Sequence, residues 1–138
     1  MAWTPYNSNI QAKYILMKAI KFRIWRLDKK EWENGIAMSS HTGELITNHN
    51  EDFVVLQFTG LKDRNGKDIY EGDILRLTPL DLQDENLPSI IGHVIWDDEN
   101  ARFIMGDTKS PHTHSVSSVY AHRLEVLGNA HENPDLLK

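Results

Sequence analysis

Hydrophobic and polar positions alternate most regularly at residues 52–77, and this stretch predicts a pair of turn-linked β-strands. In its first part, DFVVLQFTGL, Val54, Leu56 and Phe58 fall on one face at a period of two residues. The other face mixes polar and apolar side chains, which is typical of a strand with one dry face and one mixed face. We expect Gly60 to end this strand.

Two turns follow the strand. Asn65-Gly66 predicts a type I′ hairpin turn, because that turn needs positive φ at both central residues. Polar residues flank this turn on both sides, so we expect it to lie in water. Glu71-Gly72 predicts a second tight turn or bulge. The Asp73 carboxylate that follows is placed to accept hydrogen bonds from backbone N–H groups left unpaired by the turn.

Further strands are expected on both sides of this stretch. Alternation predicts strands at Lys21–Leu27, from Trp32, at Ile90–Trp96, Ala101–Met105, Ser115–Tyr120 and Arg123–Gly128. Gly92, inside one of these strands, indicates a bulge or a barrel corner. The last residues predict one helical turn, with Asn133 as the N-cap and Pro134 at the first position.

Residues 36–51 predict a long exposed loop with a short strand, and residues 78–87 predict a solvated connection. Six to eight short strands with almost no helical period predict a mainly β fold. We expect a small, partly open barrel of short antiparallel strands, or a small sandwich, with a short C-terminal helical turn. A chain of 138 residues favours one domain. We assign residues 1–16 to a poorly ordered N-terminal extension and residues 17–138 to a single β domain.

The sequence FTGLKDRNGKDIYEGDIL, followed by GHVIWDDENARFIM and LEVLGNAHENPDLL, resembles the YopX family of phage and prophage proteins. KFRIWRLDKKEW is similar to the opening strand of that family, so the resemblance covers Met17–Leu137. The first motif is specific, but it is a structural motif. The resemblance implies a small, mainly β protein encoded by a phage or prophage. It implies no established activity and supplies no catalytic residue.

Composition narrows the classes of function. The chain has no cysteine, which excludes disulfides, thiolate metal sites and cysteine nucleophiles. No apolar run approaches the roughly 20 residues of a membrane span, and the first residues lack the pattern of a secretory signal. These features predict a protein of the bacterial cytoplasm.

Seven histidines raise the question of a metal site: His41, His49, His93, His112, His114, His122 and His131. His112 and His114 form the one close pair, and on a strand their rings would share a side. Asp107 or His122 could then supply a third ligand for a divalent ion. The alternative, which we favour, is a set of solvated loop histidines beside Pro111.

The sequence contains no convergent catalytic set. Asp68, Glu71 and Asp73 could perform acid–base chemistry or bind Mg²⁺, but turn capping is the simpler interpretation. Hydroxyls lie beside imidazoles at Ser39-Ser40-His41 and at His114-Ser115, and such adjacency does not show a triad. We therefore predict a non-enzymatic protein without a cofactor and assign no catalytic, metal or binding residue.

Two kinds of partner remain open. Basic side chains are interleaved with aromatic ones on the expected strands, at Lys18, Lys21, Arg23, Arg26, Lys62, Arg64, Lys67 and Arg76. This pattern suits single-stranded nucleic acid, but a net charge of −5 disfavours it. Exposed strand edges and side chains without an obvious core partner favour self-association: Trp3, Tyr6, Trp32, Leu136 and Leu137. The leading hypothesis is a module that binds protein, either copies of itself in a homo-oligomer or a phage or host protein, and weak nucleic-acid binding is the alternative.

Overall fold

The computed structural model describes residues 20–33, 37–38, 45–46, 52–79 and 87–138, and this part of the chain is mainly β. The strands are β1 (Phe22–Arg26), β2 (Glu31–Glu33), β3 (Ala37–Met38), β4 (Leu45–Ile46), β5 (Phe53–Lys62), β6 (Asp68–Tyr70), β7 (Asp73–Leu77), β8 (Ile90–Asp97), β9 (Arg102–Asp107), β10 (Thr113–Ser115) and β11 (Leu124–Asn129). Two short 3₁₀ turns, η1 (Ala121–Arg123) and η2 (Pro134–Leu137), complete the described elements. Neither turn is long enough to cross a membrane.

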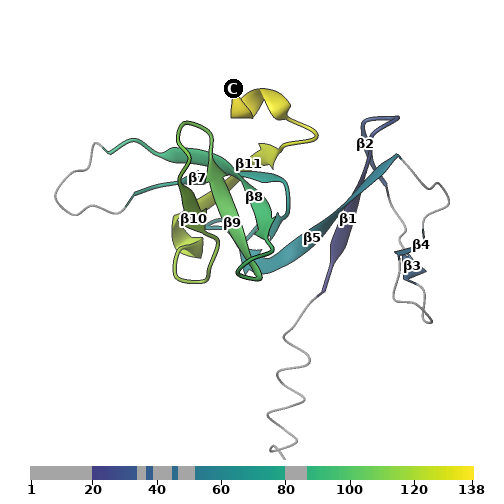
Figure 1. Cartoon of the computed structure of the whole chain (residues 1–138), viewed down its shortest axis with the longest axis horizontal. Coiled ribbons are helices and arrows are strands. Elements are labelled where there is room, and N and C mark those ends of the chain that lie inside the picture. Colours follow the sequence, from purple (N-terminus) through teal and green to yellow (C-terminus); the bar gives the residue numbers. More distant parts are fainter. Residues whose placement is uncertain (1–19, 34–36, 39–44, 47–51, 80–86) are drawn as a thin grey trace, which may run out of the picture.

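All strand pairs are antiparallel, and they form two main sheets and a two-stranded ribbon of β3 and β4. A four-stranded sheet has the order β2-β1-β5-β6, and a five-stranded sheet has the order β10-β9-β8-β7-β11. The five-stranded sheet curls on itself, while β1, β2 and the start of β5 project from it as an arm (Figure 1). The predicted mainly β fold with a partly open barrel is confirmed.

The core fills the inside of the curled sheet. It is formed by buried side chains that β6, β7, β8, β9 and β11 direct inward, together with one residue after β10: Ile69, Leu75, Leu77, Val94, Met105, Val116 and Leu124. The dry face predicted for β5 is also confirmed. Leu56 and Phe58 are buried, whereas Val55 on the opposite face is 37% exposed.

The Asn-Gly turn differs from the prediction. Gly66 has a φ of +80°, but Asn65 does not have positive φ, so the turn is not type I′. The Gly66 N–H donates to the Asp63 carbonyl, and the Asp63 N–H donates to the Lys67 carbonyl. These bonds define a three-residue loop with a type I turn and a glycine bulge.

The Asp63 side chain explains why this turn type forms. Its Oδ1 accepts hydrogen bonds from the backbone N–H groups of Asn65 and Lys67, and its Oδ2 accepts one from the N–H of Val126 on β11. The Arg64 N–H also donates to the Leu124 carbonyl. The exposed tip is therefore anchored to β11 by a buried aspartate, and only the tip lies in water as predicted.

Asp63 should contribute to the pH dependence of stability. Burial raises the pKa of its carboxyl, but the three backbone N–H donors outweigh burial and leave the pKa below its ordinary value. A carboxylate with a depressed folded pKa stabilises the fold above the unfolded pKa of about 4 and loses that contribution as pH falls through the folded pKa.

We therefore expect Asp63→Asn to lower the free energy of unfolding by about 2 kcal/mol at pH 6 and by less near pH 3. Urea denaturation at the two pH values measures the difference between variant and wild type. Asp98→Asn, in the exposed turn between β8 and β9, is the control and should leave stability unchanged. A deficit of equal size at both pH values would contradict this role for the Asp63 charge.

Two predictions about glycines also need revision. Gly60 does not end β5 but forms a bulge within it, at a φ of +87°. The pairing register runs through Gly92 without a shift, so Gly92 is not a bulge. Glycine is needed there because a Cβ would overlap the carbonyl of Gly106. The bulge lies instead on β11 at Leu127, where the register with β7 shifts between Val126 and Gly128.

The C-terminal region departs from the prediction in two places. The expected strand at Ser115–Tyr120 ends at Ser115, because β9 supplies its last paired residue there and the chain turns into η1. The helical turn at Pro134–Leu137 is present as a 3₁₀ turn, but the Asn133 side chain does not cap it. The Asn133 Oδ1 accepts from the Asn129 N–H instead. Residues 1–16 and most of the expected 36–51 loop lie outside the described residues.

Candidate functional site: a tryptophan-lined cleft

A charge pair between a buried aspartate and a partly buried arginine joins the arm to the curled sheet. The Arg23 Nη2 on β1 lies 2.6 Å from the Asp73 Oδ1 on β7. Asp73 is 1% exposed and also accepts hydrogen bonds from the Tyr70 N–H and from the Asn129 side-chain amide. The predicted capping role of Asp73 is confirmed, and the same carboxylate also holds β1 and β11 against the second turn.

Aromatic rings fix the guanidinium at this junction. The Arg23 side chain lies 4.0 Å from the ring centroid of Tyr70 and 4.6 Å from that of Trp32. The Arg23 Nε is buried and has no hydrogen-bond partner in the described structure. The contacts of Arg23 set the distance between the arm and the curled sheet, and a cleft lies beside them.

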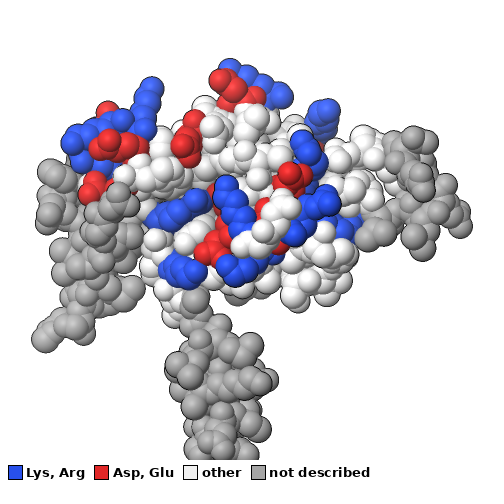
Figure 2. Space-filling model, turned by 180° about the vertical axis from the view of Figure 1, so that it is seen from behind, with Lys and Arg blue, Asp and Glu red and all other residues white. Residues whose placement is uncertain are grey.

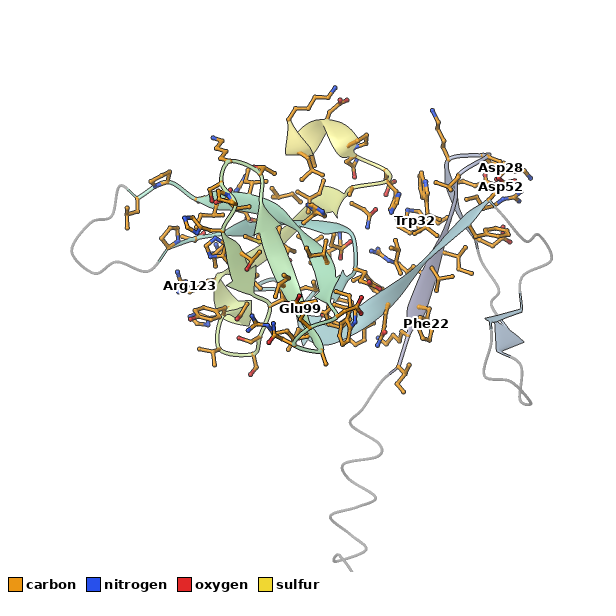
Figure 3. The ribbon with its side chains drawn as sticks, viewed as in Figure 1. Phe22, Asp28, Trp32, Asp52, Glu99 and Arg123 are labelled. Atoms are coloured by element: carbon orange, nitrogen blue, oxygen red, sulfur yellow. The ribbon has the colours of Figure 1, made fainter. Side chains whose placement is uncertain are left out.

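The cleft lies between the β1–β2 hairpin and the C-terminal segment, and its volume is about 810 Å³. Its described lining residues are Trp25, Leu27, Lys30, Glu31, Trp32, Ala130, His131, Glu132, Pro134 and Asp135. Trp25 and Trp32 face each other across the hairpin in an edge-to-face contact with centroids 4.9 Å apart. In Figure 3, Trp32 points from the arm toward the C-terminal segment.

Acidic side chains dominate the charge of this cleft. Glu31, Glu132 and Asp135 line it against one lysine, Lys30. The Glu132 carboxylate accepts a hydrogen bond from the Trp32 indole N–H at 3.0 Å, which ties the hairpin to the C-terminal segment. Burial lowers the pKa of His131, so this imidazole stays neutral at a lower pH than an exposed one. The arrangement suits a cationic side chain that can also stack on an indole.

Sequence reasoning missed this cleft. Trp32 was expected to lack a core partner, but it packs on the buried Trp25. Leu136 is exposed, as expected for a side chain without a core partner. The available signal was the spacing of Trp25 and Trp32 on either side of a predicted turn, since cross-strand aromatic pairs are common in hairpins. Glu132 could not be found in this way, because it lies 100 residues from Trp32 in sequence.

The described histidines that were considered as metal ligands do not form a three-ligand group with carboxylates. No three His, Asp or Glu side chains in the described ranges are grouped closely enough to hold a metal ion. His114 is on β10, His112 precedes that strand and His122 is in η1. The pKa of Asp107 is lowered, first by the Lys109 N–H and the Ser110 hydroxyl and less by His114 and His112. His41 and His49 lie outside the described residues.

The carboxylates near the second turn have separate partners. Asp68 bridges Lys21 at 2.8 Å and Lys62 at 2.7 Å, and the two side-chain bonds lower its pKa. The Glu71 carboxylate accepts from the Gln57 N–H at 3.0 Å. Asp73 pairs with Arg23, as described above. The three carboxylates therefore bind different partners and do not share a site. Ser39, Ser40 and their neighbour His41 lie outside the described residues.

Most of the basic residues noted in the sequence are ion-paired. Arg76 pairs with Glu125, and Arg26 pairs with Asp28 and Glu33. Lysine and arginine side chains gather across one face, with acidic side chains between them (Figure 2). Lys18 lies outside the described residues. The tip of the turn between β5 and β6 differs from these residues. Its Arg64 and Lys67 are exposed, and neither forms an ion pair within the described structure.

Comparison with known proteins supports a single family. A family model described as "YopX protein" matches residues 11–138. Protein EF1440 from Enterococcus faecalis is 26% identical, and the similarity covers 87% of this chain and 99% of that one with a TM-score of 0.55. Protein yopX from Bacillus subtilis is 22% identical, covering 85% and 97% of the two chains, with a TM-score of 0.56. No curated protein matches the chain.

Proposed function

Because the chain belongs to the YopX family, we propose that it is a phage- or prophage-encoded, non-enzymatic protein-interaction module that assembles with copies of itself in the bacterial cytoplasm. The observation that carries this proposal is the cleft lined by Trp25 and Trp32. Tryptophan is enriched among the residues that dominate binding energy at protein interfaces. The cleft is defined by side chains that are already held in place by the Trp25–Trp32 contact and the Trp32–Glu132 bond.

The occupant we propose is the β5–β6 turn tip of a second copy. The cleft presents Glu31, Glu132 and Asp135, and the tip presents two basic side chains. Arg64 and Lys67 project from a turn that Asp63 holds rigidly, so little conformational entropy would be lost on docking. An arginine entering the cleft would meet the partly exposed indole of Trp32 and carboxylates, which bind guanidinium groups by stacking and by paired hydrogen bonds.

A tip-to-cleft contact uses different surfaces on the two copies, so it is a heterologous interface. Such an interface closes into a ring or extends into a filament, depending on the rotation between neighbours. Each copy has one tip and one cleft, so the assembly would contain one contact per copy. A variant that loses only its tip cannot pair with itself, but its cleft should still bind the tip of a variant that loses only its cleft.

This property gives a direct test. We expect the wild type to assemble beyond a monomer, and both Arg64→Glu/Lys67→Glu and Glu31→Lys/Asp135→Lys to be monomeric, because charge repulsion replaces attraction. In an equimolar mixture of the two variants, tips and clefts of opposite charge meet again, both between the unchanged surfaces and between the charge-reversed ones, so the mixture should assemble beyond a monomer. Sedimentation analysis measures the mass in each case.

The control is Lys109→Glu, which reverses an exposed charge in the loop between β9 and β10 and should assemble like the wild type. A monomeric wild type would overturn the proposal. It would also be overturned if the mixture stayed monomeric while both variants kept the native circular dichroism spectrum. Assembly that is unaffected by either variant would place the interface elsewhere.

Weak nucleic-acid binding is the second candidate, and it is favoured by Arg64 and Lys67, which are exposed and form no ion pair with any residue that the structure describes. Phosphate contacts would make retention on single-stranded DNA weaken as salt rises. The tip variant should abolish such retention, whereas Glu31→Lys/Asp135→Lys should leave it intact, so the two candidates are separated. The absence of a gel shift at low salt would remove this candidate.

A further inference from the structure

A second pocket lies on the half-barrel, away from the tryptophan cleft. Its volume is about 450 Å³, and its described lining residues are Leu77, Pro79, Ile90, Thr113, His114, Ser115, Tyr120 and Arg123. These residues come from the end of β7, the start of β8, the edge strand β10 and the η1 region. Because β10 and β7 are separated by two strands in the sheet order, the pocket occupies the open mouth of the curled sheet. Such mouths are common places for small-molecule sites.

The mouth pocket divides into an apolar wall and a polar wall. Leu77, Pro79 and Ile90 supply the apolar wall, and Leu77 is continuous with the buried core. The opposite wall carries three hydroxyl groups, an imidazole and a guanidinium. None of the described residues lining the pocket is Asp or Glu. Since the whole chain has a net charge of −5, a wall whose described residues include a cation and no carboxylate is a local departure from its average charge.

Arg123 is the charged group, and the backbone holds it in position. Its Nε donates to the Thr78 carbonyl at 2.8 Å, and its own carbonyl accepts from the Thr78 N–H at 3.1 Å. The guanidinium lies 5.5 Å from the ring centroid of Tyr120. No ion pair or hydrogen bond within the described structure uses the Nη1 or Nη2 of Arg123. Toward the described residues, the two terminal nitrogens therefore keep the fork geometry that matches an oxyanion.

Of the neighbouring polar groups, only the His114 Nε2 is both buried and without a partner in the described structure, whereas Thr113 is exposed and Ser115 is half-buried. The hydroxyls of Thr113 and Ser115 form no hydrogen bond in the described structure, and both line the pocket. The Nε2 of His114 is buried and has no partner among the described residues. Buried polar atoms in native structures nearly always have a partner, which can be a water, an ion or a ligand. Figure 3 shows Arg123 on the opposite side of the molecule from Trp32, so this pocket is independent of the cleft.

We propose that the mouth pocket binds a small organic anion, in which a phosphate or carboxylate group is attached to an apolar body. The anionic group binds the Arg123 terminal nitrogens and the hydroxyls of Ser115 and Thr113. The apolar body packs against Leu77 and Ile90. The volume falls within the range of small-molecule sites, which separates this proposal from the protein contact assigned to the cleft.

Titration followed by NMR tests the proposal with four probes: phenyl phosphate, benzoate, inorganic phosphate and benzyl alcohol. We expect phenyl phosphate or benzoate to bind, with changes in NMR chemical shift confined to residues of the mouth pocket. The probe that binds more tightly identifies the anionic group. Benzyl alcohol keeps the aromatic body without the charge, and inorganic phosphate keeps the charge without the body. Each of these should bind at least about tenfold more weakly.

The variant Arg123→Gln should bind phenyl phosphate and benzoate with an affinity that is lower by about tenfold or more. Arg76→Gln is the matched control, because Arg76 lies on β7 outside the pocket and pairs with Glu125. If Arg123→Gln fails to fold, Ser115→Ala provides the weaker version of the same test. Equal binding of benzyl alcohol, unchanged binding in the folded Arg123 variant, or no binding of either anion at millimolar concentration would overturn the proposal. The tip and cleft variants should bind the anion normally, which keeps this test separate from that of self-assembly.

Discussion

The Asp73→Asn variant is expected to lose about 3 kcal/mol of unfolding free energy, because it removes the charge that compensates a largely buried guanidinium. The wild-type carboxylate serves three donors at once, from Arg23, Tyr70 and Asn129. An asparagine keeps the size of the side chain but leaves Arg23 without its counter-charge. The aromatic rings around Arg23 limit the water that could replace the carboxylate.

Urea denaturation in a single buffer measures this loss as a lower midpoint. Asp28→Asn is the matched control, since Asp28 also pairs with an arginine but does so at the exposed end of the arm. We expect the control to resemble the wild type, because exposed ion pairs contribute little. A loss of less than about 1 kcal/mol in Asp73→Asn would contradict the importance of the buried charge pair.

The Gly92→Ala variant should be destabilised by about 3 kcal/mol or fail to fold, although it adds only one methyl group. A Cβ at this position would overlap the Gly106 carbonyl, which is backbone of the neighbouring strand and cannot rotate away. Gly92 lies between β7 and β9, where it pairs with Leu75 and Asp107, so relief would require two pairings to shift. Overpacking at fixed sites typically costs from about 1 to 3 kcal/mol and sometimes more.

Gly106→Ala is the matched control on the next strand. A Cβ there would lie 4.0 Å from the side chains of His93 and Ile95, which is an ordinary contact distance. We expect this variant to remain within about 1 kcal/mol of the wild type. Thermal or urea denaturation of both variants gives the comparison. Equal stabilities for the two alanine variants would show that the sheet relaxes easily at Gly92.

The sequence predicted best where a local pattern determines the structure. The period-two pattern of Val54, Leu56 and Phe58 correctly indicated the dry face of β5, because burial of alternate residues follows from strand geometry. Turn type was predicted incorrectly, because the Asp63 side chain captures the N–H groups of the loop and overrides the preference of an Asn-Gly pair. The end of β10 could not be predicted either, since it depends on the pairing available from β9.

The two candidate sites were not visible in the sequence, because tertiary contacts assemble them. The cleft joins Trp25 and Trp32 to Glu132, and the mouth pocket joins Leu77 to Arg123. Nothing in the sequence indicated that Arg123 belongs to a binding site, since it lies apart from the basic residues noted on the expected strands. The pattern of a single element indicates which residues are buried in it, but not which distant residues it will meet.

The junction around Asp73 has a consequence for the order of folding. Arg23 lies 50 residues before Asp73 in the chain, and Asn129 lies 56 residues after it. Native pairs so distant in sequence close slowly, because loop-closure entropy is lost before the contact forms. A nascent chain can form the β5–β6 hairpin early, but the arm cannot lock onto the curled sheet until Asn129 has been synthesised. Most of the polypeptide must therefore leave the ribosome before the native arrangement is complete.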